Sequence, residues 1–188
     1  MKSLIIYGSQ YGTAKRYAET FAQMTGIPVI NYKDRKELTE YEIIIYFGGL
    51  YAGSVKGLKK TIKAFQKNTK IVIVTVGLAD VCNEENTNNI KKSLKKQVPE
   101  KILNNAAIFH LRGGIDYKKL NFKHRMMMAL LYNIAKNLPE EEKTPEVKTL
   151  IDTFHAKVDF VDYNSLNQII EAINQIRMHQ CYQIIKLR

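Results

Sequence analysis

The sequence predicts an α/β fold in which a parallel sheet carries helices on both faces. Short apolar runs that end at glycine alternate along the chain with stretches whose apolar residues recur at helical spacing. The apolar runs are continuous, which is typical of strands that are covered on both sides. No internal repeat or linker divides the 188 residues, a length that suits one domain.

The first strand and the first helix are the clearest pair of elements. Residues 2–8 form an apolar run that ends at Gly8, and the apolar side chains of 13–25 then recur every three or four residues. Gly26 ends this helix, and Pro28 prevents its continuation. The further elements that we expect are strands at 27–31, 42–47, 70–76 and 106–111, and helices at 55–65, 84–96, 145–154 and 165–177.

The last residues of the chain fit this alternation less clearly. Residues 179–188 alternate weakly between apolar and polar, and we interpret them as a small added strand. We therefore expect a main domain at 1–177 with a basic amphipathic insertion at about 115–138, and a C-terminal extension at 178–188.

The charge of the chain is unusual. Lysine and arginine number 29 against 18 aspartates and glutamates, which gives a net charge of +11. Such a surface favours an anionic partner, either a nucleic acid, an acidic lipid surface or an acidic protein. A lysine-rich proteome explains the same number equally well.

The cysteines and histidines indicate which metal or disulfide sites the chain can form and in which cellular compartment it resides. Cys82 and Cys181 lie too far apart for a disulfide framework or a CxxC metal site, so we expect a reducing, cytoplasmic setting. The apolar run at the start is shorter than the core of a signal peptide. The histidines lack metal-ligand spacing, so we expect structural or surface roles for them and no metal: His110, His124, His155 and His179.

The loop at residues 9–14 is the first candidate site. It follows a buried strand and opens a helix, so its free backbone N–H groups form a receptor for phosphate at the positive end of the helix dipole. Gly12 is followed by Thr13 and Ala14, which excludes a Walker loop, and the GxGxxG dinucleotide fingerprint is absent. The plain alternative is a turn in which Ser9 or Thr13 caps the helix.

Two further loops follow buried strands and should meet the first at one edge of the sheet. Residues 48–54 combine glycines, which let the backbone approach a flat ligand, with the stacking face of Tyr51. A glycine-rich turn with a half-buried Tyr51 is the alternative. Residues 75–82 offer backbone hydrogen bonds to the edge of an aromatic ring.

Together these three loops resemble those of a flavodoxin, in order and spacing over residues 1 to about 177. The resemblance implies a flavodoxin-like, doubly wound sheet of five parallel strands in the order 2-1-3-4-5, and FMN as cofactor. Tyr11 stands where threonine is usual, and Ala14 replaces a final threonine, which removes hydroxyls but keeps the backbone cradle. The resemblance assigns the FMN phosphate to Ser9, Gln10, Tyr11, Gly12, Thr13 and Ala14. It assigns the face of the flavin ring to Gly49, Leu50, Tyr51, Ala52 and Gly53. It assigns the edge of the ring to Val76, Gly77, Leu78, Ala79 and Asp80.

The insertion narrows the resemblance to the menaquinone-dependent protoporphyrinogen oxidase branch of the superfamily. A glycine–aromatic stretch there leads through basic residues into an apolar helix. This branch implies a quinone or a porphyrinogen as electron acceptor or donor. The residues that match the pattern of this branch are Gly113, Ile115, Tyr117, Phe122, Arg125 and Met127.

A basic, methionine-rich helix also suits an anionic membrane or an apolar ligand. Contact would run through Lys118, Lys119, Lys123 and Arg125, at the inner face of the membrane. The alternative is a core helix with a solvated lysine face.

Three functions are compatible with these features of the sequence. We favour an FMN oxidoreductase that acts on a small molecule, because the flavin then supplies the chemistry and no acid–base residue is required. A non-catalytic flavodoxin carrier is the alternative, although such carriers are usually acidic. An FMN-free scaffold for an anionic polymer is disfavoured, because no nucleic-acid-reading motif is present.

Overall fold

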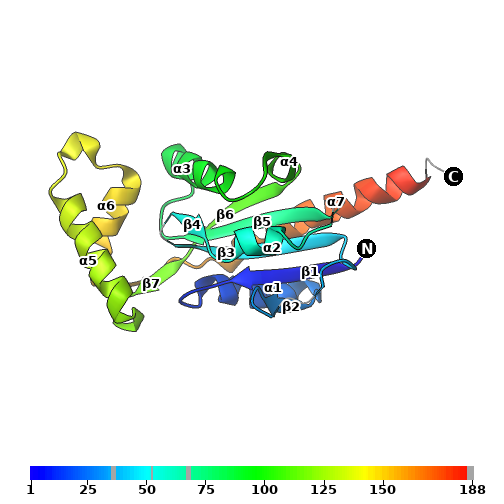
Figure 1. The fold of residues 1–188 in the computed structure, drawn as a ribbon, viewed down its shortest axis with the longest axis horizontal. Coiled ribbons are helices and arrows are strands. Elements are labelled where there is room, and N and C mark those ends of the chain that lie inside the picture. Colours follow the sequence, from blue (N-terminus) through cyan, green and yellow to red (C-terminus); the bar gives the residue numbers. More distant parts are fainter. Residues whose placement is uncertain (35–36, 52, 67–68, 186–188) are drawn as a thin grey trace.

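A five-stranded parallel sheet forms the centre of the molecule (Figure 1). The computed structural model describes the backbone of residues 1–34, 37–51, 53–66 and 69–185, and side chains within these ranges up to residue 178. The sheet order is β2-β1-β3-β5-β6, which confirms the predicted order 2-1-3-4-5 of the five main strands. These strands are β1 (Ser3–Gly8), β2 (Val29–Asn31), β3 (Ile43–Tyr51), β5 (Lys70–Gly77) and β6 (Ala107–Arg112).

Helices cover both faces of this sheet, as predicted. On one face lie α1 (Thr13–Thr25) and α7 (Asn167–Ile185), and on the other lie α2 (Leu58–Ile62), α3 (Glu84–Lys95) and α4 (Glu100–Leu103). The two hydrophobic clusters between helices and sheet form the core.

Strand β3 shows why the apolar runs are continuous. Ile43, Ile45 and Phe47 pack in the cluster under α1 and α7, while Ile44 and Tyr46 pack in the cluster under α2 and α3. All five side chains are fully buried. Because each large apolar side chain contributes about 1.5–3 kcal/mol on burial, both faces of the strand stabilise the fold.

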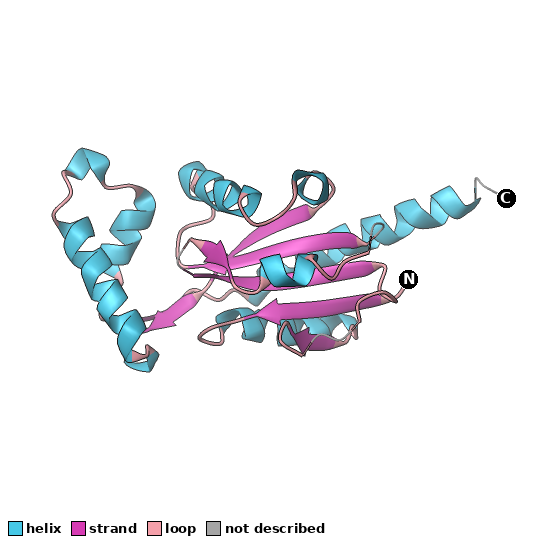
Figure 2. Cartoon of the chain, viewed as in Figure 1, coloured by secondary structure: helices cyan, strands magenta, loops and turns pink. Residues whose placement is uncertain are grey.

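A separate lobe projects from the carboxyl edge of the sheet, at the end of the molecule opposite the C-terminus (Figure 2). We call it the α5–α6 lobe, residues 114–159. An antiparallel ribbon of two short strands carries it. Its elements are β7 (Gly114–Asp116), the 3-10 turn η1 (Tyr117–Lys119), α5 (Phe122–Lys136), the 3-10 turn η2 (Glu140–Glu142), α6 (Pro145–Asp152) and β8 (Lys157–Asp159).

Helix α1 anchors the base of the lobe. The Tyr17 hydroxyl donates to the carbonyl of Arg112 at 2.8 Å and accepts from the backbone N–H of Asp162 at 2.9 Å. Arg16 donates to the Asp159 carboxylate at 2.7 Å. Both strands that enter and leave the lobe are therefore tied to the same helix.

Three parts of the structure differ from the sequence prediction. Strand β3 continues into the predicted loop as far as Tyr51 and pairs with β4 (Ser54–Val55), so the predicted helix 55–65 is wrong at its start and α2 has only five residues. Val55 has the spacing of a helix residue relative to the apolar residues that follow it, but its pairing with Leu50 places it in a strand. The ribbon β7–β8 and helix α4 were not predicted, because elements of three or four residues are too short to show a period.

The strand predicted at 179–188 is also wrong over its described part, because α7 continues as a helix to Ile185, and residues 186–188 lie outside the described residues. Extending an existing helix adds a hydrogen bond for each residue that is fixed. A strand needs a partner strand instead, and weak alternation of apolar residues does not supply one.

We predict that acid destabilises the protein through His110 on β6. Burial lowers the pKa of His110 below its usual 6.5, and the charge of Lys91 lowers it further. Below about pH 6.5 the unfolded chain therefore binds a proton that the folded chain does not, and the free energy of unfolding falls as pH falls toward the lowered pKa, by at most about 1.4 kcal/mol per pH unit.

Urea unfolding at pH 7.5 and 5.5 measures this loss. The variant His110→Gln has no titrating ring and keeps an acceptor for the Thr75 hydroxyl, which lies 2.7 Å from the His110 Nδ1 atom. It should lose less stability than the wild type across this interval. Equal losses in both proteins would show that His110 does not cause the acid sensitivity.

Candidate functional site

The carboxyl ends of the strands and the α5–α6 lobe enclose a cleft of about 710 Å³. Its walls come from the loops after β1, β3, β5 and β6, from helix α3, and from α5 and α6. The structure thus brings together the three loops that the sequence singled out. The predicted cofactor residues that line the cleft are Ser9, Gln10, Tyr11, Thr13, Ala14, Gly49, Leu50, Tyr51, Gly53, Val76, Gly77, Leu78 and Ala79.

Two other predicted residues do not line it, and a third cannot be placed. Gly12 is the N-cap of α1, directly beside the lining residues. Asp80 holds its own loop in shape, because its carboxylate accepts from the Cys82 N–H at 3.0 Å and its carbonyl accepts from the Asn86 side-chain amide at 2.9 Å. Ala52 lies outside the described residues.

The first loop presents the N-terminus of α1 to the cleft. Gly12 has a φ of 98°, a left-handed conformation that favours glycine, and no side chain caps the helix. The Ser9 hydroxyl accepts from the Gly12 N–H at 3.0 Å, and the Thr13 hydroxyl donates to the Gly114 carbonyl at 3.4 Å. The alternative in which Ser9 or Thr13 caps α1 is therefore wrong, and the first-turn amides have no partner within the helix.

The second loop is a tight β-hairpin rather than an open turn. Leu50 pairs with Val55 and Tyr51 pairs with Ser54. The hydroxyl of Ser93, on α3, donates to the Gly53 carbonyl at 2.6 Å and fixes the tip of the hairpin. Tyr51 is half-buried on the cleft wall, and its burial raises its pKa, as does the nearby Tyr11.

His124, for which the sequence predicted a structural or surface role, lines the cleft. Its ring centroid lies 4.6 Å from that of Tyr51 and 5.5 Å from that of Tyr11, and its Nδ1 atom forms a hydrogen bond with the Tyr11 hydroxyl. No local pattern joins positions that are more than 70 residues apart, so only the docking of α5 against the sheet edge reveals this cluster. We call His124, Tyr11 and Tyr51 the aromatic rim.

Helix α3 forms a polar wall, which a signal in the sequence could have indicated. Asn86, Asn89, Ser93 and Lys96 are spaced by three or four residues and line the cleft together. Asn86 is 1% exposed, and its Oδ1 atom has no hydrogen-bond partner among the described residues. A buried acceptor without a partner is costly, so this wall suits a ligand that carries a donor.

The opposite wall is mostly apolar. It comes from the inner sides of α5 and α6, which no strand or loop pattern in the sequence assigned to the site. The apolar residues of these two helices that line the cleft are Met127, Met128, Leu131, Val147 and Leu150.

Comparison with known proteins agrees with this architecture. The sequence model of the flavodoxin domain family matches residues 4–142. No curated protein sequence matches the chain.

Similar solved structures include flavoproteins and flavodoxins. A Lactobacillus acidophilus flavoprotein in complex with FMN is 14% identical, with a TM-score of 0.39 over 59% of this chain and 91% of that one. An archaeal flavodoxin is 14% identical, with a TM-score of 0.41 over 68% and 90%. Oxidised flavodoxin 2 from Bacillus cereus is 13% identical, with a TM-score of 0.32 over 81% and 94%.

We predict that His124 holds the N-terminal turns of α5 against the sheet. His124→Ala removes two ring contacts of about 0.5–1.5 kcal/mol each, together with the hydrogen bond to Tyr11. Hydrogen exchange of the backbone amides in the first half of α5 should become about tenfold faster, which corresponds to about 1.4 kcal/mol. Mass spectrometry of peptides from residues 117–131 measures this rate.

Lys123→Ala is the matched control for this experiment. Lys123 is the preceding residue on the same helix, but it is exposed. Its substitution should leave the exchange rate unchanged. If both variants exchange like the wild type, the aromatic rim does not hold the lobe.

Proposed function

The chain belongs to the flavodoxin domain family, and on this basis we propose that it binds FMN in the cleft and transfers electrons as an oxidoreductase. One observation carries the proposal. The uncapped N-terminus of α1 opens on the same cleft as the hairpin with Tyr51 and the loop with Gly77. A phosphate receptor, an aromatic side chain and a glycine-containing backbone edge thus surround one space.

The residues of the cleft fit each part of this cofactor. The first-turn amides of α1 suit its phosphate, which the positive end of the helix dipole attracts. The orphan Oδ1 atom of Asn86 suits a ring N–H donor. At Gly77 a Cβ atom would lie 2.8 Å from the end of the Leu50 side chain, so a larger residue would have to displace Leu50 at this edge of the cleft.

The aromatic rim would set the position of the ring. A ring that stacks on Tyr51 competes with His124, whose centroid lies 4.6 Å away, for this contact. Bound FMN would supply the electron-transfer chemistry. The residues of the chain would bind it, orient it and exclude water from its ring.

The apolar wall of α5 favours an enzyme for small molecules over a carrier that docks on proteins. Met127, Met128 and Leu131 face into the cleft instead of leaving it open to a protein partner. On α3, Lys92 and Lys96 line the same cleft. A substrate with an apolar ring system and anionic groups would match the apolar wall and the lysines, respectively. A porphyrinogen has both features. A quinone matches the apolar wall alone.

We predict that Gly12→Val weakens FMN binding at least tenfold but leaves riboflavin binding unchanged. A β-branched residue is unfavourable at a φ of 98°, so the loop must shift. The backbone N–H groups of the first turn of α1 then no longer point toward the phosphate. Riboflavin lacks the phosphate and should bind more weakly than FMN to the wild type. Titration of each ligand, followed by its visible absorbance, measures both affinities.

Gly26→Val is the matched control. Gly26 lies at the other end of α1 with a φ of 68°, and a Cβ atom at either glycine meets nothing within 4 Å. Both variants therefore place a β-branched residue at a positive φ, but only one alters the phosphate loop. Equal FMN affinity in the two variants, or a protein that takes up no FMN at all, would refute the proposed site.

We predict that Met127→Asp slows electron transfer to an apolar acceptor. A carboxylate on the apolar wall makes the binding of a naphthoquinone less favourable. Reoxidation of the photoreduced protein by a soluble naphthoquinone under anaerobic conditions should be about tenfold slower at limiting quinone. Ferricyanide, a small polar oxidant, should react equally with variant and wild type.

The adjacent Met126 provides the control, because it is 59% exposed and does not line the cleft. Met126→Asp should behave like the wild type with both oxidants. Turnover of protoporphyrinogen with naphthoquinone then tests the finer assignment. If Met127→Asp reacts with the quinone as fast as the wild type and protoporphyrinogen is not oxidised, the electron-carrier alternative replaces the enzyme.

A further inference from the structure

Helix α5 exposes a stripe of large apolar side chains on the side away from the cleft. Phe122, Met126, Leu130 and Ile134 are 74%, 59%, 62% and 54% exposed. Their spacing of four residues places them along one side of the helix. Ala135, which is buried, lies on the opposite side of the helix. The stripe is therefore separate from the wall that faces the proposed cofactor.

Basic side chains surround the N-terminal half of this stripe. Lys118 and Lys119 precede the helix, and Lys123 and Arg125 lie in its first turns, all four with exposed side chains. Among the described residues none of the four has a carboxylate within ion-pair distance; the ion pairs lie elsewhere. Their charges are therefore free to attract an anionic surface.

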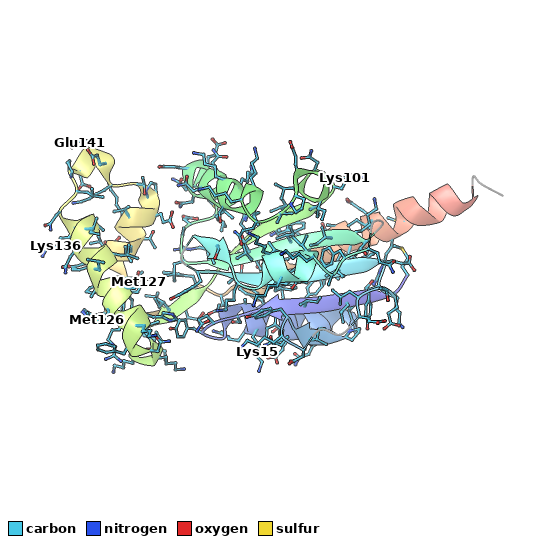
Figure 3. All side chains as sticks on the ribbon, viewed as in Figure 1. Lys15, Lys101, Met126, Met127, Lys136 and Glu141 are labelled. Atoms are coloured by element: carbon cyan, nitrogen blue, oxygen red, sulfur yellow. The ribbon has the colours of Figure 1, made fainter. Side chains whose placement is uncertain are left out.

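The other end of the lobe carries the opposite charge. Glu140, Glu141 and Glu142 form η2, which follows α5. Glu140 pairs with Lys143 at 3.1 Å and with Lys148 at 2.9 Å, while the part of the chain that the structure describes holds no ion pair of Glu141 or Glu142. Figure 3 labels Met126 near one end of the lobe and Glu141 at the other. An anionic surface would therefore attract the end with Lys118, Lys119, Lys123 and Arg125 rather than the end with the three glutamates.

We propose that the lobe docks on an anionic lipid bilayer through this basic apolar face, which consists of Phe122, Met126 and Leu130 with Lys118, Lys119, Lys123 and Arg125. Apolar side chains enter the headgroup region while the flanking cations bind acidic headgroups. None of the helices in the described part of the chain combines the length and the apolar character that a bilayer crossing demands.

Charge decides between a bilayer and a second copy of the chain as the occupant of this face. Two copies that joined their apolar stripes would bring two sets of like charges together, on chains that each carry a net charge of +11. Such repulsion opposes self-association. An anionic lipid surface complements both the stripe and the cations around it.

Co-sedimentation with vesicles tests the charged part of the face. The protein should pellet with phosphatidylcholine vesicles that contain phosphatidylserine, and not with phosphatidylcholine alone. Each basic residue near an anionic surface contributes about fivefold to partitioning. The triple variant Lys118→Glu, Lys119→Glu, Lys123→Glu should therefore partition at least about a hundredfold more weakly.

A matched charge control distinguishes this face from a merely cationic protein. Lys59, Lys60 and Lys63 lie at α2, over the sheet and away from the lobe, and are exposed. Changing all three to glutamate alters the net charge by the same amount. This variant should keep most of the binding. Equal loss in both triple variants would overturn the proposal, because the attraction would then be general.

The apolar part has its own test. Phe122→Ser with Met126→Ser should abolish the binding that survives high salt, which screens the charges. Met24→Ser with Met178→Ser removes exposed apolar side chains from α1 and α7 and should change nothing. Wild-type vesicle binding by the first pair would overturn the proposal. A dimer of the wild-type protein in the absence of vesicles that this pair dissociates would also overturn it, in favour of self-association. None of these outcomes depends on FMN.

Discussion

The absence of side chains at the carboxyl end of β1 and at the position paired with it on β3 is the constraint on which the cleft depends. Gly8 and Gly48 are in register on these neighbouring strands. A Cβ atom at Gly8 would lie 1.9 Å from the Lys56 carbonyl oxygen, and one at Gly48 would lie 2.1 Å from a Val55 methyl group. The β3–β4 hairpin can therefore fold back across the end of the sheet, which places Tyr51 on the cleft wall.

Helix α1 couples this edge of the sheet to the α5–α6 lobe. Its N-terminus forms the proposed phosphate receptor, and one turn later Arg16 and Tyr17 hold the chain where it enters and leaves the lobe. Where β6 ends, the Arg112 guanidinium lies 3.9 Å from the centroid of the Phe160 ring, just beyond the lobe. Movement of the lobe would therefore strain the helix that we propose as the phosphate receptor, which couples the lobe to the proposed cofactor site.

The sequence predicted what depends on long regular patterns. The buried strands and α1 follow from continuous apolar runs and helical spacing, because each has enough residues to show its period. The convergence of the three loops follows from right-handed crossovers in a parallel sheet. What it missed depends on contacts between distant residues. The contacts of His124 and the extension of β3 to pair with β4 are set by tertiary packing, which no local pattern encodes.

Helix α5 is apolar on two sides, which a helix on a globular surface ordinarily is not. Met127 and Met128 line the cleft, while Phe122 and Met126 are exposed to solvent on the other side. Cleft packing explains the first side alone, and the second is unfavourable in water unless another apolar phase covers it. If a bilayer is that phase, the proposed ring site lies one helix diameter from the lipid. An apolar electron acceptor would then pass from membrane to cleft around α5 without full exposure to water.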